Sequence, residues 1–185
     1  MYWSAWPPCT RSIPRRRWPG RSAITKPHAN QAVRVGLISD THGLLRPEAL
    51  AFLAGCDHIV HGGDIGNAAI LERLAQIAPL TVVRGNNDRE AWARTIPVTA
   101  TLQVGPISLY AIHDLKELDI DPAACGVRVV VSGHSHKPAC AERNGVLYLN
   151  PGSAGRRRFS LPVSAAELVI EDGRVRPRIV TLVAS

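Results

Sequence analysis

Five short stretches of the chain combine His, Asp and Asn side chains in a way that suits divalent cations. They are Asp40-Thr41-His42, Gly62-Gly63-Asp64, Gly85-Asn86-Asn87-Asp88, His113 and Gly133-His134-Ser135-His136. Carboxylates supply anionic oxygens, imidazoles supply neutral nitrogens suited to Mn, Fe, Co, Ni and Zn, and an Asn carbonyl adds a ligand without adding charge. Two cations roughly 3.5–4 Å apart can clamp the oxygens of an in-line phosphoryl displacement. The residue types therefore predict metal-dependent hydrolysis of a phosphate ester.

Each of these motifs is weak evidence when it is taken alone. A lone Asp-x-His or Gly-Asp occurs by chance, and Gly-Asn-x-Asp is also typical of ordinary turns. Gly133-His134-x-His136 carries more weight, because two His residues at positions i and i+2 are hard to explain by packing. The whole series, in order after successive predicted strands, favours a metal centre over a set of structural roles.

The first half of the chain predicts elements that bring these motifs together. Apolar, β-branched runs alternate with helical patterns, which predicts a parallel sheet with right-handed crossovers. The ligands of such sheets gather beyond the carboxyl ends of the strands. The expected elements are a strand at Val33–Ser39, a helix at Pro47–Ala54, a strand at His58–His61, a helix capped by Asn67 with Ile70, Leu71, Leu74 and Ile77 on one face, and a strand at Leu80–Val83.

The second half predicts strands joined by tight turns. Gly105-Pro106, Asn144-Gly145 and Asp172-Gly173 each lie between two apolar runs, as in hairpins. So many strands in a short chain predict an α/β fold in which two sheets pack face to face with the helices outside. The expected strands are Val98–Val104, Ile107–Ile112, Arg128–Val131, Pro138–Glu142, Val146–Leu149, Ala165–Ile170 and Val175–Val183.

The net charge of +7 is concentrated in the N-terminal segment. Residues 1–32 contain six Arg and Lys and no Asp or Glu, so the remaining chain is nearly neutral. We expect this Pro-rich segment to be a disordered extension, with a nucleic-acid or membrane arm as the alternative. A neutral domain argues against nucleic acid as the substrate. No apolar run long enough for a signal peptide or a membrane helix follows, and the four Cys show no paired spacing, which predicts a cytoplasmic protein.

Two further sets of polar residues have structural explanations. His58 and His61 alternate with apolar residues in a predicted strand, which favours buried histidines over metal ligands. Arg156-Arg157-Arg158 is more typical of a solvated basic run, although a contact with phosphate is the alternative.

The ordered motifs resemble those of the calcineurin-like metallophosphoesterase superfamily. Their short spacing, together with Leu149-Asn150-Pro151-Gly152-Ser153, is similar to the YfcE-type phosphodiesterase branch, and the resemblance covers residues 33–183. It implies an αββα four-layer sandwich of two mixed β-sheets flanked by helices, formed by a domain at residues 33–185. Related small members self-associate, so a homo-oligomer is also expected.

The resemblance also implies a role for each motif residue. One cation would be bound by Asp40, His42 and His136, and the other by Asn86, His113 and His134, with Asp64 bridging the two. A hydroxide between the cations would attack phosphorus. Mn is the expected metal, with Fe, Ni, Co, Zn and Mg as alternatives. We expect Asp88 to shape its loop, and Asp114 either to orient His113 or to be a solvated loop residue.

Asn87 departs from the pattern of the superfamily, in which many members have a His that can protonate the leaving oxygen. An amide is not an acid, so Asn87 can at most donate a hydrogen bond to phosphate. Our hypothesis is that the substrates have leaving groups that depart without strong acid help, or that water is the acid. Asn87→His should then raise turnover of alkyl esters relative to aryl esters, and an unchanged ratio would contradict it.

Three functions from different classes follow from these observations. The leading one is hydrolysis of a small phosphate ester, with a phosphodiester preferred because of the YfcE-type resemblance. The second is a non-catalytic scaffold, because the small subunit of the retromer shares this fold and binds partner proteins. The third is a nuclease with the basic segment as its arm. All four His residues of the proposed metal centre are present, which favours the enzyme.

Overall fold

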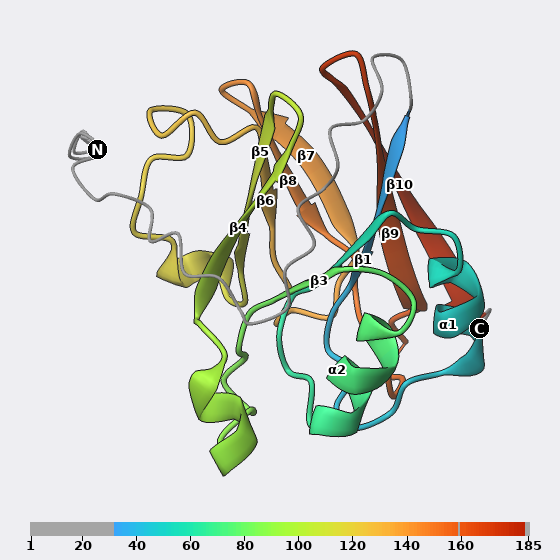
Figure 1. The fold of residues 1–185 in the computed structure, drawn as a ribbon. Coiled ribbons are helices and arrows are strands. Elements are labelled where there is room, and N and C mark those ends of the chain that lie inside the picture. Colours follow the sequence, from blue (N-terminus) through green and yellow to red (C-terminus); the bar gives the residue numbers. More distant parts are fainter. Residues whose placement is uncertain (1–31, 159, 184–185) are drawn as a thin grey trace.

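The protein forms two five-stranded sheets that pack face to face (Figure 1). The structure is a computed structural model that describes residues 32–158 and 160–183, so the expected N-terminal extension lies outside the described residues. The first sheet has the order β10-β9-β1-β2-β3, formed by Arg174–Val183, Val163–Glu171, Val33–Ile38, His58–His61 and Leu80–Val82. The second has the order β4-β5-β6-β8-β7, formed by Thr99–Val104, Ile107–Ile112, Val129–Val131, Val146–Asn150 and Ala139–Arg143.

The first sheet is built around the predicted parallel strands. β1, β2 and β3 are parallel, whereas β9 pairs with β1 in the antiparallel direction and β10 pairs with β9. Helices α1 (Pro47–Leu53) and α2 (Ala68–Ala75) cover its outer face. α2 begins where expected, because the side chain of Asn67 accepts a hydrogen bond from the backbone nitrogen of Ala69 at 2.8 Å. Its residues Ile70 and Leu74 are buried in the cluster that joins helix and sheet.

The second sheet is also mixed. β5, β6 and β8 are parallel, and the antiparallel strands β4 and β7 form its edges. Its outer face is covered by residues 115–127, which contain the short 3-10 helix η2 (Leu115–Glu117) and pack on Tyr110, Val130 and Val146. The predicted sandwich of two mixed sheets is confirmed, and among the described residues its fourth layer is this loop and short helix.

The main core lies between the two sheets. Alternate residues along each strand point into it, as the period of two in a β-strand requires. Val35 and Leu37 from β1 and Val129 from β6 are completely buried there, together with residues from β4, β5 and β9. Apolar packing of this kind fixes the register of each strand, and the strands in turn fix where their polar ends emerge.

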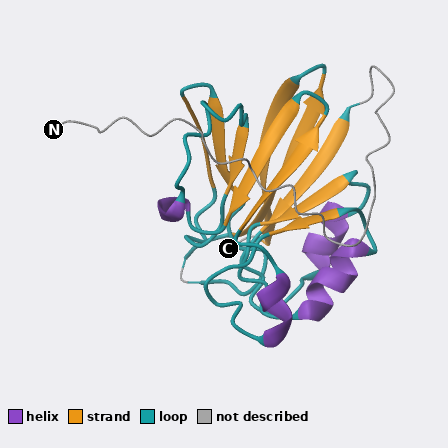
Figure 2. Cartoon of the chain, turned by 60° about the vertical axis from the view of Figure 1, so that its left-hand side comes forward, coloured by secondary structure: helices purple, strands orange, loops and turns teal. Residues whose placement is uncertain are grey.

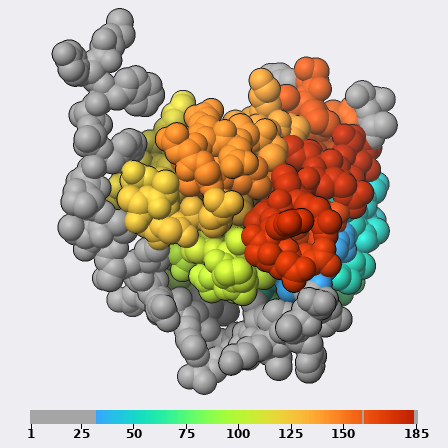
Figure 3. All heavy atoms as spheres, turned by 90° about the horizontal axis from the view of Figure 1, so that it is seen from above, coloured from blue at the N-terminus to red at the C-terminus, as the bar shows by residue number. Residues whose placement is uncertain are grey.

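The two ends of the sandwich are different in character. The carboxyl ends of the parallel strands in both sheets meet at one end, where Figure 2 shows the loops and the helices gathered. A second 3-10 helix, η1 (Ala91–Thr95), lies in the connection from β3 to β4 at this end. Figure 3 looks onto the opposite end, where the β7–β8 and β9–β10 hairpins lie side by side. None of the helices in the described part of the chain is long and apolar enough to span a membrane.

Candidate metal centre

The backbone at the predicted ligands has an unusual conformation. A positive φ is uncommon in residues other than glycine and costs about 1–3 kcal/mol where the surrounding structure imposes it. Five predicted ligands have it, namely Asp40 (54°), His42 (45°), Asp64 (54°), His134 (65°) and His136 (58°). Such strain persists only where tertiary contacts hold it, and it gathers at functional sites.

Long-range hydrogen bonds hold these left-handed residues in place. The backbone nitrogen of Asp40 donates to the carbonyl of Gly63, and that of His42 donates to the carbonyl of Asp64, both at 2.9 Å. The backbone nitrogen of His134 donates to Oδ2 of Asp40 at 3.1 Å, which ties the second sheet to the first. The loops after β1, β2 and β6 are therefore joined to one another at the end of the sandwich.

The first group of ligands consists of Asp40, His42 and His136. Oδ1 of Asp40 is buried and accepts no hydrogen bond from the described residues, although Nε2 of His136 lies 3.2 Å away. The Nε2 atoms of His42 and His136 face each other at 3.2 Å, and the two rings are stacked. A buried carboxylate oxygen without a partner is costly. A divalent cation fits it, because one oxygen and two imidazole nitrogens here lie within 4.8 Å of one another.

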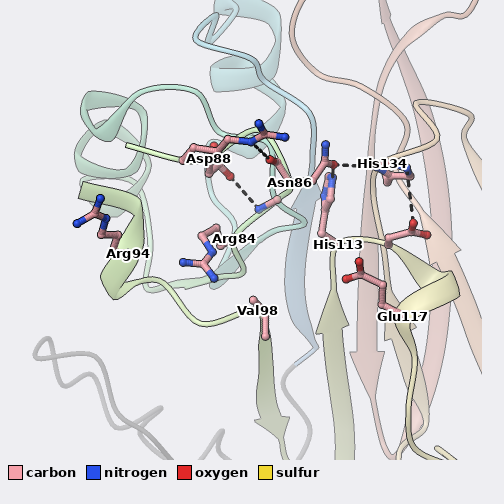
Figure 4. A pocket seen from close by; sticks show the side chains of 11 residues that line it. Arg84, Asn86, Asp88, Arg94, Val98, His113, Glu117 and His134 are labelled. Carbon is pink, nitrogen blue, oxygen red and sulfur yellow. Dashed lines mark hydrogen bonds and ion pairs between the residues drawn. The ribbon is translucent and has the colours of Figure 1, made fainter. Parts of the chain in front are cut away.

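The second group consists of Asn86, His113 and His134 (Figure 4). Oδ1 of Asn86 lies 3.1 Å from Nε2 of His113 and 3.0 Å from Nδ1 of His134, so one amide oxygen faces both imidazoles. Nδ1 of His113 donates to the carbonyl of Gly62 at 2.7 Å, and this bond leaves Nε2 as the nitrogen that can bind a metal.

Asp64 lies between the two groups. Its Oδ2 is 3.7 Å from Nε2 of His42 and 3.4 Å from Nε2 of His113. Burial alone would raise the pKa of this carboxyl group, but the hydrogen bonds from His113 and Asn87 outweigh burial and hold the pKa well below its usual range. Asp64 is therefore ionised at neutral pH, and its position is the one that the predicted bridging role requires.

The same environment favours the neutral form of His42 as a metal ligand. Burial lowers its pKa, and the positive charge of Arg158 adds to this effect, while Asp64 and Asp40 oppose it. Arg156, Arg157 and Arg158 are all exposed, as expected of a solvated basic run. The charge of Arg158 nevertheless helps to lower the pKa of His42.

Three polar residues contact the predicted ligands or their loops, namely Asp88, Asn87 and Asp114. The two carboxylate oxygens of Asp88 accept hydrogen bonds from the backbone nitrogens of Gly66 and Gly85, both at 2.9 Å. Asn87 donates to Asp64 twice, from its backbone nitrogen at 2.9 Å and from Nδ2 at 2.6 Å. The amide that we expected to face phosphate is therefore bound to a ligand carboxylate.

Asp114 contacts a different histidine from the one expected. Its Oδ2 lies 3.6 Å from Nε2 of His134, and its Oδ1 caps η2 by accepting a hydrogen bond from the nitrogen of Lys116. His113 is instead oriented by the carbonyl of Gly62. The side chain of His134 is 42% exposed, so the contact with Asp114 restrains the most open of the imidazoles.

Sequence reasoning missed two residues that hold the ligand loops. Nδ2 of Asn150 donates to the carbonyl of Gly133 at 2.6 Å and to Oγ of Ser135 at 3.1 Å, and its Oδ1 accepts from the nitrogen of Gly152. Oγ of Ser153 donates to the carbonyl of Asp40 at 2.9 Å. Both residues belong to the Asn150-Pro151-Gly152-Ser153 segment, which the sequence identified only as part of a resemblance.

The two histidines of β2 have structural roles. Oγ1 of Thr41 donates to the carbonyl of Ile65, so it must accept the contact at 3.0 Å from Nε2 of His61. His61 then accepts at Nδ1 from the nitrogen of Gly63. His58 contacts Oγ1 of Thr81 at 2.8 Å. Burial lowers the pKa of each to about 4, so both are neutral, as expected of buried histidines.

The comparisons with known proteins agree with this geometry. The family described as calcineurin-like phosphoesterase superfamily domain matches residues 33–173, and the chain belongs to this family. A probable metallophosphoesterase of Methanocaldococcus jannaschii is 32% identical over 151 residues, which cover 75% of this chain and 76% of the relative. A probable metallophosphoesterase of Methanothermobacter thermautotrophicus is 33% identical over 141 residues, which cover 69% and 81%.

Solved structures share the fold at lower identity. A predicted phosphoesterase from Streptococcus pneumoniae has a TM-score of 0.67 at 22% identity and covers 83% of this chain and 92% of its own. An archaeal phosphodiesterase has a TM-score of 0.66 at 21% identity and covers 80% and 100%. Vacuolar protein sorting 29 from Cryptosporidium parvum has a TM-score of 0.65 at 21% identity and covers 80% and 97%. These similarities establish the metallophosphoesterase fold.

Proposed function

We propose that this protein is a phosphodiesterase that depends on two divalent cations, with Mn as the preferred metal and a small phosphodiester as the substrate. The observation that carries the proposal is the unpartnered, buried Oδ1 of Asp40, which faces the imidazoles of His42 and His136. Asp64 links this group to His113, and the sets Asp40, His42 and His136 and Asp40, Asp64 and His113 each bring donor atoms that suit divalent cations within 4.8 Å of one another.

The roles of the side chains follow from their contacts. Asp40, His42 and His136 would hold one cation, Asn86, His113 and His134 the other, and Asp64 both. Bound cations would supply the Lewis acidity that polarises phosphate and makes water nucleophilic at neutral pH. Asp64 is held in its ionised form by Asn87 and His113, and the carbonyl of Gly62 accepts from Nδ1 of His113, so Nε2 is the ring nitrogen that would face a cation.

The position of Asn87 bears on the leaving group. In the hydrolysis, the oxygen of water bonds to phosphorus and releases one proton, the bond from phosphorus to the leaving oxygen breaks, and that oxygen leaves with the electron pair. A proton must then reach the leaving oxygen. Nδ2 of Asn87 is bound to Asp64 and is not an acid, so Asn87 does not supply this proton. Esters with stable leaving oxyanions, such as aryl esters, are the expected good substrates.

The fold match to vacuolar protein sorting 29 favours a second candidate, a protein-interaction scaffold. The two functions make opposite demands on the ligand residues. A scaffold needs a surface, whereas hydrolysis needs an intact ligand set that tolerates no substitution. The chain retains His42, His113, His134 and His136 and keeps strained backbone at three of them, which favours the enzyme.

Hydrolysis of a chromogenic aryl phosphodiester, bis(p-nitrophenyl) phosphate, by the purified chain with Mn tests the proposal. We expect turnover that EDTA abolishes and that Mn restores. Asp64→Asn and His134→Ala should each lower turnover by at least about a hundredfold, because the first removes the charge of the predicted bridging carboxylate and the second removes a predicted ligand. Asp172→Asn, at the opposite end of the sandwich, is the matched control and should keep full activity. A folded protein without turnover with any divalent cation would instead support the scaffold.

A further inference from the structure

A pocket of about 460 Å³ opens beside the second group of ligands (Figure 4). Asn86, His113 and His134 line one part of it. The segment between β3 and β4 lines another part with Arg84, Arg94 and Val98, and Glu117 of η2 lies below His134. A phosphate bound by the metal centre would therefore place one of its ester arms in this pocket.

The arginines of the pocket carry charge that the described residues do not neutralise. Within residues 32–158 and 160–183, the guanidinium groups of Arg84 and Arg94 make neither a hydrogen bond nor an ion pair. Of the acids that line the pocket, Asp88 already accepts bonds from two backbone nitrogens, and Asp114 lies 3.6 Å from Nε2 of His134. Two cationic groups therefore face the pocket and are free to bind an anion.

Two other side chains of the pocket, Val98 and Glu117, affect which ester arm it can hold. Val98 is 54% exposed, and no other large hydrophobic side chain among the described residues is exposed. Glu117 lies across the pocket from Arg84 and Arg94, and no described residue pairs with its carboxylate, so it would repel an anion placed on its side. An arm with a short apolar linker and an anionic end would find an apolar contact at Val98 and guanidinium groups at Arg84 and Arg94.

We propose that the pocket is a subsite for a second anionic group, so that the natural substrate is a phosphodiester with a phosphate or a carboxylate on one ester arm. Arg84 and Arg94 bind that group, because guanidinium groups match the planar or tetrahedral oxygens of both anions. This inference rests on the proposed phosphodiesterase function. It adds a class of substrate that the metal centre by itself does not select.

Three matched aryl diesters test the subsite. They are propyl, 2-carboxyethyl and 2-phosphonooxyethyl p-nitrophenyl phosphate, which release the same leaving group and differ in the end group of the retained arm, which is neutral in the first and anionic in the other two. With Mn, kcat/KM should be about tenfold higher for the anionic arms than for the propyl arm. The preference should shrink as salt rises from low to high ionic strength. Whichever anionic arm is preferred identifies the group, phosphate or carboxylate, that the subsite takes.

The double variant Arg84→Gln/Arg94→Gln should lower the ratio of kcat/KM for the anionic arms to that for the propyl arm to about one. The change should come mainly from a higher KM for the anionic substrates. Arg143→Gln/Arg174→Gln removes two charges from the hairpins at the opposite end of the sandwich, and it should keep the preference. Equal kcat/KM for the three substrates, or a preference that survives the pocket variant, would overturn the subsite while leaving the proposed function intact. Absence of metal-dependent turnover with all three substrates would overturn both.

Discussion

The two ends of the sandwich use the same unusual backbone conformation for different reasons. At the hairpin end, Asn144 and Asp172 have φ of 50° and 49°, and each precedes a glycine, Gly145 or Gly173, whose φ is also positive. This is the backbone of a type I′ hairpin turn, which Asn-Gly and Asp-Gly favour locally. At the metal end, Asp40, Asp64, His134 and His136 have the same conformation without a glycine after them, and long-range hydrogen bonds join their loops.

The difference separates local from tertiary control of structure. A hairpin turn depends on two adjacent residues, so a change there has a small and contained effect. The metal end depends on bonds such as those of Ser153 to Asp40 and of Asn150 to Gly133, which join distant segments. A change at that end should therefore disturb both the stability of the fold and the position of the ligands.

Gly85→Ala should have the largest effect. A Cβ at residue 85 would lie against Oδ1 and the backbone nitrogen of Asp64, well inside contact distance, and neither can move without disturbing the metal centre. We expect turnover to fall by about a hundredfold, because displacement of a ligand by about 1 Å has effects of this size. The free energy of unfolding should fall by about 3 kcal/mol, as in overpacked cores. Chemical denaturation and steady-state kinetics check both. Normal activity in this variant would show that Asp64 is not a ligand.

The free energy of unfolding should depend on pH because His58 is buried in its neutral form. The pKa of His58 is lowered by burial to about 4, against about 6.5 in the unfolded chain. The unfolded chain therefore binds a proton that the folded protein does not, and stability is lost as the pH falls from 6.5 towards 4. His58 accounts for about 2 kcal/mol of the loss between pH 6.5 and pH 5.

His58→Gln removes this titration and keeps the other histidines. The loss of stability between pH 6.5 and pH 5, measured by denaturant unfolding, should be smaller in the variant by about 2 kcal/mol. Turnover at pH 7.5 should stay within about twofold, because His58 contacts Thr81 and no ligand. Parallel stability curves for the two proteins would show that folding does not lower the pKa of His58.

Gly145→Ala should have the smallest effect and completes the comparison with Gly85→Ala. The new Cβ would meet only Nη1 of Arg128, at 3.5 Å, so the cost arises from the positive φ of 74°. We expect a loss of about 1 kcal/mol in the free energy of unfolding and unchanged turnover. A loss of activity here would mean that the two ends are coupled, which the local nature of the turn argues against.

Much of the architecture could be predicted because it depends on local patterns. The apolar runs, the Asn67 cap and the Asn-Gly and Asp-Gly turns each act over a few residues, and they gave the strands and helices of the structure within a few positions. The pairing of β9 with β1 could not be predicted in this way, since it joins residues more than 120 positions apart and depends on packing in the central core. The thin outer layer of the second sheet likewise follows from packing on Tyr110 and Val130.

The sequence by itself determined which residues could act as metal ligands, because metal coordination demands particular donor atoms and their order after successive strands is visible in the chain. Only the tertiary structure decided which donors meet. It assigned Asn87 to Asp64, Asp114 to His134, and Asn150 and Ser153 to the ligand loops. Side-chain pairing of this kind depends on the relative position of loops from different strands, which no local preference specifies. The pocket lined by Arg84 and Arg94 likewise depends on segments that the fold brings together.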